Sequence, residues 1–353
     1  MVAISPRARA RLGGLLLGAG LDALLGDPAR WHPVAGFGGL AARVERTSYR
    51  DDRFAGAVHT AVLVAAVAVP AAALDHQIAR CVSGMSGRRW VRGSSPSGAV
   101  GAGLVVTAGL GWVVLGGTSL RRAGRALGAA LAAGDLDGAR ALLPTLCGRD
   151  PAELDESALA RGAIESIAEN TCDAVVAPLW WGAVAGLPGL AAYRAVNTLD
   201  AMIGHHSARY ERFGAAAARL DDLMNLVPAR LGALAACVCA PVVGGSPADA
   251  YWVLRRDGRS HPSPNAGLAE AAFAGALGLR LGGELRYPYR VEQRPRLGFG
   301  RPPAGADVAA AARLSAATGM LGLTVTVLAA AVVSILRGRI PLRGRTRKGR
   351  VRT

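Results

Sequence analysis

The sequence predicts an all-α, polytopic membrane protein with helical segments on the cytosolic side and re-entrant or interfacial elements. Of its 353 residues, 51% are hydrophobic and only 5% are aromatic, so the apolar side chains are mainly small and aliphatic. The mean hydropathy is +0.28, which is high for a soluble globular protein. Several uncharged runs reach the roughly 20 residues that a helix needs to cross the hydrocarbon core. No segment shows a convincing strand alternation.

We treat residues 1–353 as a single polytopic domain with four candidate spans. Three of these are free of charge, and the fourth is shorter and contains Pro241. The predicted spans are residues 54–74, 94–120, 231–248 and 314–336. Small residues in such runs allow helix backbones to approach each other closely within a bilayer.

The segments between these spans are long, charged and patterned as helices, and we expect residues 149–230 and 255–300 to form the catalytic side. Asp150-Pro151-Ala152-Glu153 has the composition of a helix start. Residues 215–227 predict a short helix with a polar edge at Asp221 and Asn225. The Pro-, Gly- and Arg-rich stretch 284–305 predicts a loop.

The formal charge of +16 comes almost entirely from arginine. Because the basic residues alternate with apolar runs instead of forming one stripe, we expect no nucleic-acid partner. The densest group is a basic tail at residues 337–353, directly after a predicted span, which is typical of a cytoplasmic segment. We therefore expect a multi-pass protein of the cell inner membrane with the lipid bilayer as partner, and an oligomer remains possible. The five cysteines form no CxxC pair, so a zinc ribbon is excluded.

Carboxylate, amide and arginine side chains recur in three successive segments between residues 149 and 230. Two interpretations remain open. One is internal ion pairing, of Arg161 with Glu165 or of Arg219 with Asp222. The other is a site for Mg²⁺ and phosphate, because Mg²⁺ prefers one or two carboxylates plus phosphate oxygens and arginine forks match phosphate. Two further residues lie outside this region. His32 is either structural or catalytic, and Asn265 either starts a helix that packs through small residues or faces an anion at the N-terminus of that helix.

Several blocks occur in an order that resembles the adenosylcobinamide-phosphate synthase family of cobalamin biosynthesis (CobD/CbiB). The resemblance covers roughly residues 15–300. The blocks are Asp22 with Asp27-Pro28 and His32-Pro33-Val34, Gly148-Arg149-Asp150, residues 164–170 with Asp173, residues 197–202, Arg219-Leu220-Asp221-Asp222 with Asn225, and residues 263–267 and 280–283.

The resemblance implies an ATP-dependent amide ligase with ATP and Mg²⁺ as cofactors. Its substrates would be adenosylcobyric acid and aminopropanol or aminopropanol O-phosphate, and its product adenosylcobinamide or its phosphate. We hypothesise catalytic roles for Glu165, Glu169, Asp222 and His32. The metal ligands would be Glu169, Asp173, Asp221 and Asp222. Substrate or phosphate contacts would come from Arg161, Asn170, Asn197, Asp200, Arg209, Arg219, Asn225 and Asn265.

Because ATP and the corrinoid are cytosolic, all of these side chains should face the cytoplasm. Were the uncharged stretch 174–193 to cross the bilayer, Glu169 and Asp200 would lie on opposite sides. We therefore predict that this stretch is re-entrant or interfacial and is shielded by protein. Two other classes remain: a Mg²⁺-dependent prenyl or phosphoalcohol transferase of the membrane, and a corrinoid-related transporter component. The sequence shows neither paired DxxxD motifs for the first nor a repeat for the second.

Overall fold

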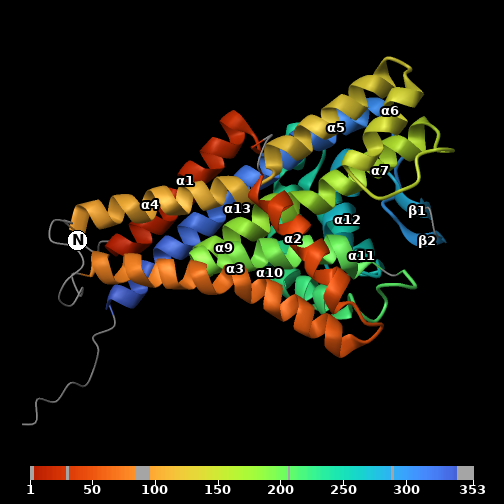
Figure 1. Ribbon diagram of the computed structural model, residues 1–353. Helices are drawn as coiled ribbons and strands as arrows, with labels where there is room; N and C mark the ends of the chain where they lie inside the picture. The colour runs from red at the N-terminus through yellow and green to blue at the C-terminus, as the bar shows by residue number, and fades with distance from the viewer. Residues whose placement is uncertain (1–3, 29–31, 84–95, 206, 288–289, 340–353) are drawn as a thin grey trace, which may run out of the picture.

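The computed structural model describes residues 4–28, 32–83, 96–205, 207–287 and 290–339, and within these ranges the chain is almost entirely helical (Figure 1). The longest helices are α1 Pro6–Leu25, α3 Arg53–Val82, α4 Pro96–Val114, α10 Ala215–Cys239 and α13 Gly305–Arg339. The shorter ones are α2 Pro33–Ser48, α5 Gly117–Ala132, α6 Leu136–Leu142, α7 Glu156–Thr171, α8 Ala177–Ala185, α9 Leu187–Leu199, α11 Pro247–Asp257 and α12 Ala266–Leu277. The all-α prediction is confirmed, with one small sheet as an addition.

The molecule has two ends, which we call the near end and the far end. At the far end the start of α1 meets the last turns of α13, where the Ser5 amide donates to Ser334 Oγ at 3.4 Å. Arg7 of α1 also pairs there with Asp75 of α3. At the near end, the Gly305 amide at the start of α13 donates to Glu156 Oε1 of α7 at 3.1 Å. Figure 1 shows α6, α7, α11 and α12 gathered at the near end, on the right.

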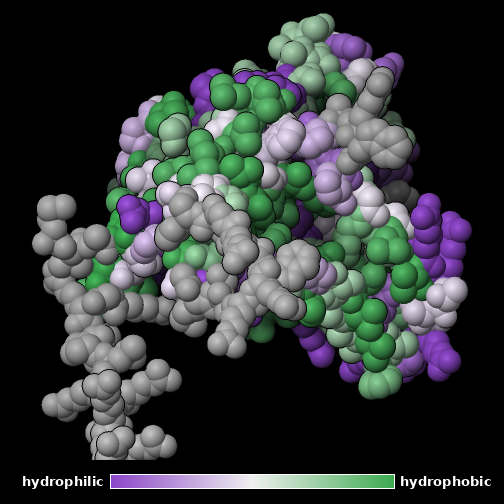
Figure 2. Space-filling model, turned by 60° about the vertical axis from the view of Figure 1, so that its left-hand side comes forward, coloured by the Kyte–Doolittle hydropathy of each residue, from purple (hydrophilic) through white to green (hydrophobic). Residues whose placement is uncertain are grey.

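Four helices in the described part of the chain are long and apolar enough to cross a membrane: Arg53–Val82, Ser97–Ala132, Ala215–Val243 and Gly305–Leu336. They overlap the four predicted spans. Many of their large apolar side chains are exposed, as they are on α1, and Figure 2 shows such side chains gathered on one face. Examples are Leu16, Leu17, Val62, Val69, Val105, Leu328 and Val332. An apolar surface of this kind is suited to lipid.

The helix α10 differs from its prediction. The expected short helix at 215–227 continues into the first half of the expected span at 231–248 as one helix that ends at Cys239, with Pro228 accommodated inside it. The rest of that span forms a 3-10 turn, Ala240–Val243, and the residues that lead into α11. Asp221 and Asn225 therefore lie on the same helix as the apolar run. Both ends of α10 pack at the near end: the Phe213 carbonyl just before it lies against Gly56 of α3, and Gly245 just after it lies against the Ala276 carbonyl of α12. This helix thus lies across the molecule instead of reaching the far end.

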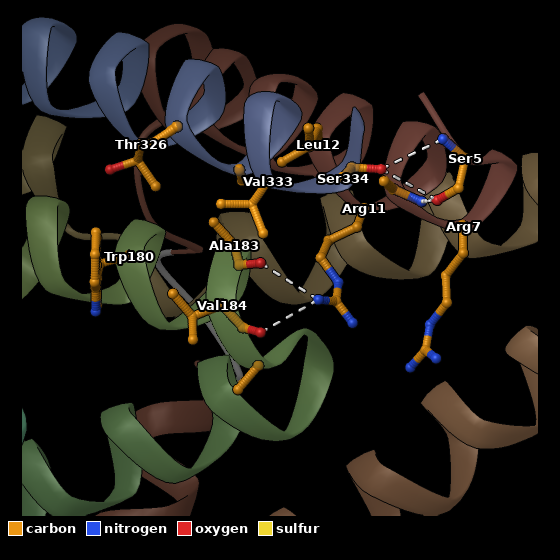
Figure 3. A pocket seen from close by; sticks show the side chains of 14 residues that line it. Ser5, Arg7, Arg11, Leu12, Trp180, Ala183, Val184, Thr326, Val333 and Ser334 are labelled. Atoms are coloured by element: carbon orange, nitrogen blue, oxygen red, sulfur yellow. Dashed lines mark hydrogen bonds between the residues drawn. The ribbon is translucent and has the colours of Figure 1, made fainter. Parts of the chain in front are cut away.

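The stretch 174–193 does not run through as one helix but folds back as a hairpin of α8 and α9, the shape that the predicted re-entrant or interfacial element requires; we call it the re-entrant hairpin. Gly186 joins them with a φ of 73°, a left-handed conformation that suits glycine. At Gly189 an added Cβ would lie 2.2 Å from the Trp181 carbonyl oxygen, so the two helices touch backbone to backbone. Arg11 of α1 donates to the carbonyls of Ala183 and Val184 at the hairpin tip (Figure 3). The tip thus points toward the far end, and both feet of the hairpin stay at the near end.

The predicted loop at 284–305 is wrong in its first half, where an antiparallel hairpin forms. Strand β1 Leu281–Tyr287 pairs with β2 Arg290–Leu297, with Glu284 opposite Gln293 and Leu285 opposite Glu292. Distant residues hold β1 in place: Arg161 of α7 donates to the carbonyls of Gly282 and Glu284, each at 2.7 Å. A sequence pattern does not reveal such long-range contacts, which explains the error. Residues 340–353 of the predicted basic tail lie outside the described residues.

Candidate active site

A cavity of about 610 Å³ opens at the near end, between α7, α10, α12, the feet of the re-entrant hairpin and the β-hairpin. Polar and charged side chains line most of it. They include Arg149, Glu165, Ser166, Glu169, Asn170, Asp173, Asp200, Asp221, Asp222, His261, Ser263, Glu270, Tyr287 and Arg294. The predicted convergence of residues from distant segments is thus present for much of the set.

One wall of the cavity is formed by five carboxylates, which we call the acidic wall: Glu169, Asp173, Asp200, Asp221 and Asp222. Glu169 lies on α7, and Asp173 follows in the π-helical turn Cys172–Val176. Asp200 begins a second π-helical turn, Asp200–Gly204, after α9. The re-entrant hairpin therefore carries Asp173 and Asp200 at its two feet and returns both to one cavity, which agrees with the prediction that Glu169 and Asp200 share a side.

Amide and hydroxyl groups fix the orientation of Asp221. Asn225 donates to Asp221 Oδ2 at 2.9 Å, and Asn197 donates to Oδ1 at 3.4 Å. Tyr193 donates to Asn225 Oδ1 at 3.0 Å and lies 3.4 Å from Asp173 Oδ1. Asn197 and Asn225 are thus positioned behind the acidic wall and hold one of its members.

Asn265 orients the second aspartate of α10. Its Nδ2 donates to the Asp222 carbonyl at 2.8 Å and lies 3.4 Å from Asp222 Oδ1. Its own Oδ1 is buried and has no hydrogen-bond partner in the described part of the chain. This oxygen borders a small recess of about 20 Å³ that Glu169, Asp173 and Asp221 also line. The recess therefore gathers oxygen atoms of the kind that bind hard cations.

Burial and mutual repulsion raise the pKa values of the acidic wall. Burial, followed by the charges of Asp221 and Glu169, raises the pKa of Asp173 well above its usual range. The same effects raise the pKa of Asp200 to about 7. Burial also raises the pKa of Glu169, although Arg294 opposes the shift. A bound cation would relieve this repulsion and favour the ionised forms.

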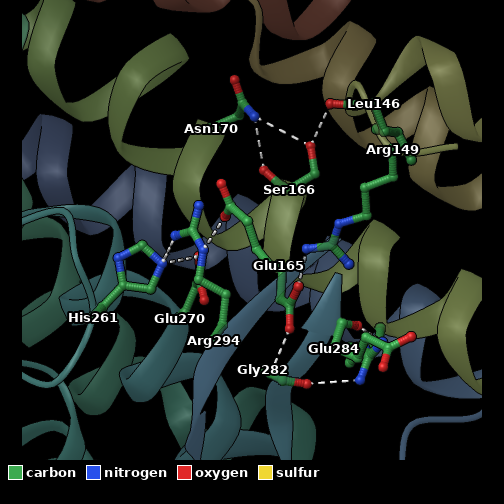
Figure 4. Close-up of polar contacts among 12 residues, drawn as sticks. Leu146, Arg149, Glu165, Ser166, Asn170, His261, Glu270, Gly282, Glu284 and Arg294 are labelled. Atoms are coloured by element: carbon green, nitrogen blue, oxygen red, sulfur yellow. Dashed lines mark hydrogen bonds and ion pairs between the residues drawn. The ribbon is translucent and has the colours of Figure 1, made fainter. Parts of the chain in front are cut away.

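The opposite side of the cavity carries two arginines, each paired with a glutamate, and is shown in Figure 4. Arg149 pairs with Glu165, whose Oε1 accepts from the Gly282 amide at 2.6 Å. Arg294 of β2 contacts His261 Nε2, and His261 Nδ1 accepts from the Ser263 amide at 3.0 Å. Burial and the neighbouring Arg294 lower the pKa of His261 to about 4, so this imidazole is neutral at pH 7. The cavity is thus acidic on one side and carries two arginines on the other.

Several predicted site residues have other roles in the structure. Glu165 lines the cavity but joins Arg149 to the β-hairpin, and its ion-pair partner is Arg149 instead of the expected Arg161. Arg161 itself holds β1. Arg209 pairs with Glu45 at 2.9 Å and stacks over Tyr49, away from the cavity.

His32 and Arg219 also lie outside the cavity lining. His32 caps the start of α2, where its Nδ1 accepts from the Val34 amide at 3.2 Å. Arg219 is exposed on α10, one residue after the cavity-lining Ala218. Asn170, by contrast, lines the cavity, and its Nδ2 donates to the Ser166 carbonyl at 2.9 Å.

Among the charged or titratable cavity residues that the sequence reasoning missed are Arg149, His261, Glu270 and Arg294. Arg149 stands in a block that carried the resemblance, so that block was the available signal. His261 and Glu270 flank the noted block 263–267, but a single histidine and a single glutamate carry no spacing signal. Arg294 lies in the segment expected to be a loop, so its position depended on a β-hairpin that was not predicted.

Within the described residues, no three His, Cys, Asp or Glu side chains are placed to hold a metal ion by themselves. The donor set nevertheless fits Mg²⁺, which keeps several waters and uses one or two carboxylates plus substrate phosphates. The unpartnered Asn265 oxygen and the repelling carboxylates support this fit. Glu169, Asp173, Asp221 and Asp222 are the residues that would hold the ion.

The protein has apolar helices long enough to span a bilayer and a charged cavity at one end. These features define a polytopic membrane protein with an enzyme-like site. The model of the family described as CobD/Cbib protein matches residues 15–315, and the chain belongs to this family. Its members act in cobalamin biosynthesis, as the names of the relatives state.

A cobalamin biosynthesis protein CobD from Mycobacterium tuberculosis is 52% identical over 305 residues, which cover 86% of this chain and 91% of the relative. The relative of the same name from Rhodobacter capsulatus is 41% identical over 84% of this chain and 90% of its own length. The relative of the same name from Geobacter metallireducens is 43% identical, over 79% of this chain and 83% of its own length. No solved structure was found to match the chain.

Proposed function

We propose that this protein forms the amide bond between adenosylcobyric acid and aminopropanol or aminopropanol O-phosphate, at the expense of ATP. The product is adenosylcobinamide or its phosphate. The reaction takes place at the cytosolic face of the inner membrane, where both ATP and the corrinoid are available. The observation that carries the proposal is the cavity with an acidic wall on one side and Arg149 and Arg294 on the other.

A carboxylate does not condense with an amine in water unless one of its oxygens becomes a leaving group. In the proposed reaction, a carboxylate oxygen attacks the γ-phosphorus of ATP and ADP leaves, which gives an acyl phosphate. The amine nitrogen then attacks the acyl carbon, phosphate leaves, and the nitrogen gives up a proton. Phosphoryl transfer of this kind depends mainly on positioning and charge neutralisation.

The side chains divide these tasks between the two sides of the cavity. Mg²⁺, when bound, would neutralise charge on the phosphates. Arg149 and Arg294 both face the cavity and are each paired with a glutamate, Arg149 with Glu165 and Arg294 with Glu292, so their remaining N–H groups would bind anionic groups of the substrates. Asn197 and Asn225 keep Asp221 in place, and Asn265 does so for Asp222.

Asp200 is suited to accept the proton from the attacking amine. Its pKa of about 7 lies close to the operating pH, which is where a general base works best. It replaces His32 in the role that the sequence suggested, because His32 caps α2 outside the cavity. Glu169 and Asp173, which face the same cavity, remain as ligands of the cation.

The test is ATP-dependent ligation by the purified protein in nanodiscs, with adenosylcobyric acid and either amine. We expect Asp173→Asn and Asp221→Asn each to lower kcat/KM roughly 100-fold and to shift the Mg²⁺ dependence to higher concentration. Asp137→Asn is the matched control, because this carboxylate on α6 is 94% exposed and lies outside the cavity. Near-normal rates and Mg²⁺ dependence in both site variants, or ligation without ATP, would refute the proposal.

A further inference from the structure

A second cavity, of about 810 Å³, lies at the far end, away from the acidic wall (Figure 3). It is formed by the start of α1, the tip of the re-entrant hairpin and the last turns of α13. We call it the far-end cavity. Its lining comes from three segments that are distant in the sequence, residues 5–12, 180–185 and 326–334. None of them contributes to the near-end cavity.

One side of the far-end cavity is basic and polar. Arg7 and Arg11 both line it, and they share the single carboxylate of Asp75, with the Arg11 Nη2 at 3.6 Å from Asp75 Oδ2. One positive charge therefore remains in this group. Ser5 and Ser334 stand beside it, with their hydroxyl oxygens 3.4 Å apart. A group of this composition complements an anion such as a phosphate diester.

The other side of the far-end cavity is apolar and opens onto lipid-facing surface. Leu12, Ala329, Ala330 and Val333 line it, and Trp180 adds an aromatic ring of the kind found where membrane meets water. Exposed apolar side chains continue outward along α13, at Leu328, Val332 and Leu336. An apolar wall in contact with the bilayer is accessible to an acyl chain.

Thr326 adds a hydroxyl group to the residues that line the far-end cavity. This side chain lines the far-end cavity, is only 2% exposed, and its Oγ1 has no hydrogen-bond partner among the described residues. A buried hydroxyl without a partner is unfavourable, and a hydrocarbon chain alone would leave it so.

We propose that the far-end cavity binds a phospholipid with an anionic headgroup. The phosphate lies at Arg7, Arg11 and Ser5, and an acyl chain lies against the wall formed by Leu12, Ala330 and Val333. Arginine side chains that match phosphate oxygens, next to an apolar wall open to the bilayer, are the two features that such a lipid requires. The protein's own tail is a poor occupant, because residues 343–352 contain six basic residues that Arg7 and Arg11 would repel.

The test uses Trp180 as a reporter in the full-length protein. The protein is placed in phosphatidylcholine nanodiscs that contain increasing amounts of phosphatidylglycerol with brominated acyl chains, and quenching of tryptophan fluorescence is measured. Because the chain has six tryptophans, Trp180→Phe supplies the background. We expect Trp180 quenching to saturate at a several-fold lower fraction of phosphatidylglycerol than of brominated phosphatidylcholine.

Two pairs of variants separate the headgroup from the acyl chain. Arg7→Gln should raise the half-saturating fraction about five-fold, the equivalent of about 1 kcal/mol per basic side chain near anionic lipid. Arg9→Gln is its matched control, because Arg9 is exposed on the same helix and does not line the far-end cavity. Ala329→Phe should reduce quenching by filling the cavity, whereas Leu328→Phe, one residue away and outside the lining, should not.

Three outcomes would overturn the proposal. Equal half-saturation for the two lipids would mean that bulk lipid fills the space without selection. Equal effects of Arg7→Gln and Arg9→Gln would mean that only general surface charge matters. Complete displacement by inorganic phosphate would identify a site for free anions. None of these readouts depends on ligase activity.

Discussion

Among single residues, the carboxylates of the acidic wall lower the stability of the fold, because burial and then their mutual repulsion disfavour the ionised forms. Asp200 has a pKa of about 7 in the folded protein, against 3.8 for an unperturbed aspartate. Between these values the folded state binds more protons than the unfolded state. Stability therefore falls as the pH rises through this window, and the penalty is complete above about pH 7.

We predict that Asp200→Asn removes this penalty. The variant should unfold at a higher temperature than the wild type at pH 8, and the gain should shrink toward pH 4, where the penalty is absent. Its ligation rate should fall, and the rise in wild-type rate through about pH 7 should disappear. Thermal unfolding and a pH–rate profile measure these effects. Asp137→Asn should change neither, and equal stability changes at both pH values would contradict the assignment.

Glu165 and Glu169 are the same type of residue, but they have different partners in the structure. Both are glutamates on α7, one helical turn apart. Glu165 is buried between Arg149 and the Gly282 amide, so its charge is already satisfied. Glu169 faces the cavity beside Asp221 and Asp173, and within the described residues it forms no ion pair, although the charges of Arg294 and Arg149 favour its ionised form. Their i,i+4 spacing predicts a shared helix face, but it does not predict which partner each one meets.

At the scale of elements, the re-entrant hairpin determines whether the acidic wall forms. Asp173 precedes α8 and Asp200 follows α9, so the close packing of these two helices fixes the separation of their carboxylates. The two helices are in close backbone contact at Gly189, because a Cβ there would meet the Trp181 carbonyl oxygen at 2.2 Å. Any side chain at this position must push the helices apart.

We predict that Gly189→Ala lowers the stability by about 1–3 kcal/mol, the usual effect of overpacking, and also lowers the ligation rate. Gly20→Ala in α1 is the matched control, since no atom lies within 4 Å of the added methyl group. It should be neutral or slightly stabilising, because alanine favours helix. Thermal unfolding and ligation assays provide the comparison, and equal behaviour of the two variants would show that the hairpin contact is unimportant.

At the scale of the whole molecule, α13 conflicts with one expectation from the sequence. A cytosolic tail and a cytosolic site were both predicted. The structure places the start of α13 beside α7 at the near end and Ser334 beside Ser5 at the far end. If α13 crosses the bilayer, the chain leaves it on the side opposite the near-end cavity. The two expectations therefore cannot both hold, and the cytosolic origin of ATP favours the site.

This topology predicts opposite labelling of the two ends. In a variant without its five native cysteines, Ser83→Cys marks the far end after α3, and Ala152→Cys marks the near end before α7. A membrane-impermeant maleimide should label position 83 in intact spheroplasts and position 152 only in inverted vesicles. Labelling of both positions from one side would show that the bundle does not cross the membrane as proposed.

Local sequence patterns predict the helical membrane class, the approximate positions of the four long apolar helices and the carboxylates that form the acidic wall. These follow from local composition, because apolar runs of sufficient length and carboxylates among small residues are visible without a fold. Contacts between distant segments, which no local pattern shows, attach Glu165 and Arg161 to the β-hairpin, bring Arg294 and His261 into the cavity and direct α10 across the bundle. The physical reason is the same in each case: the partner of a buried charge and the direction of a helix are set by contacts between segments far apart in the chain.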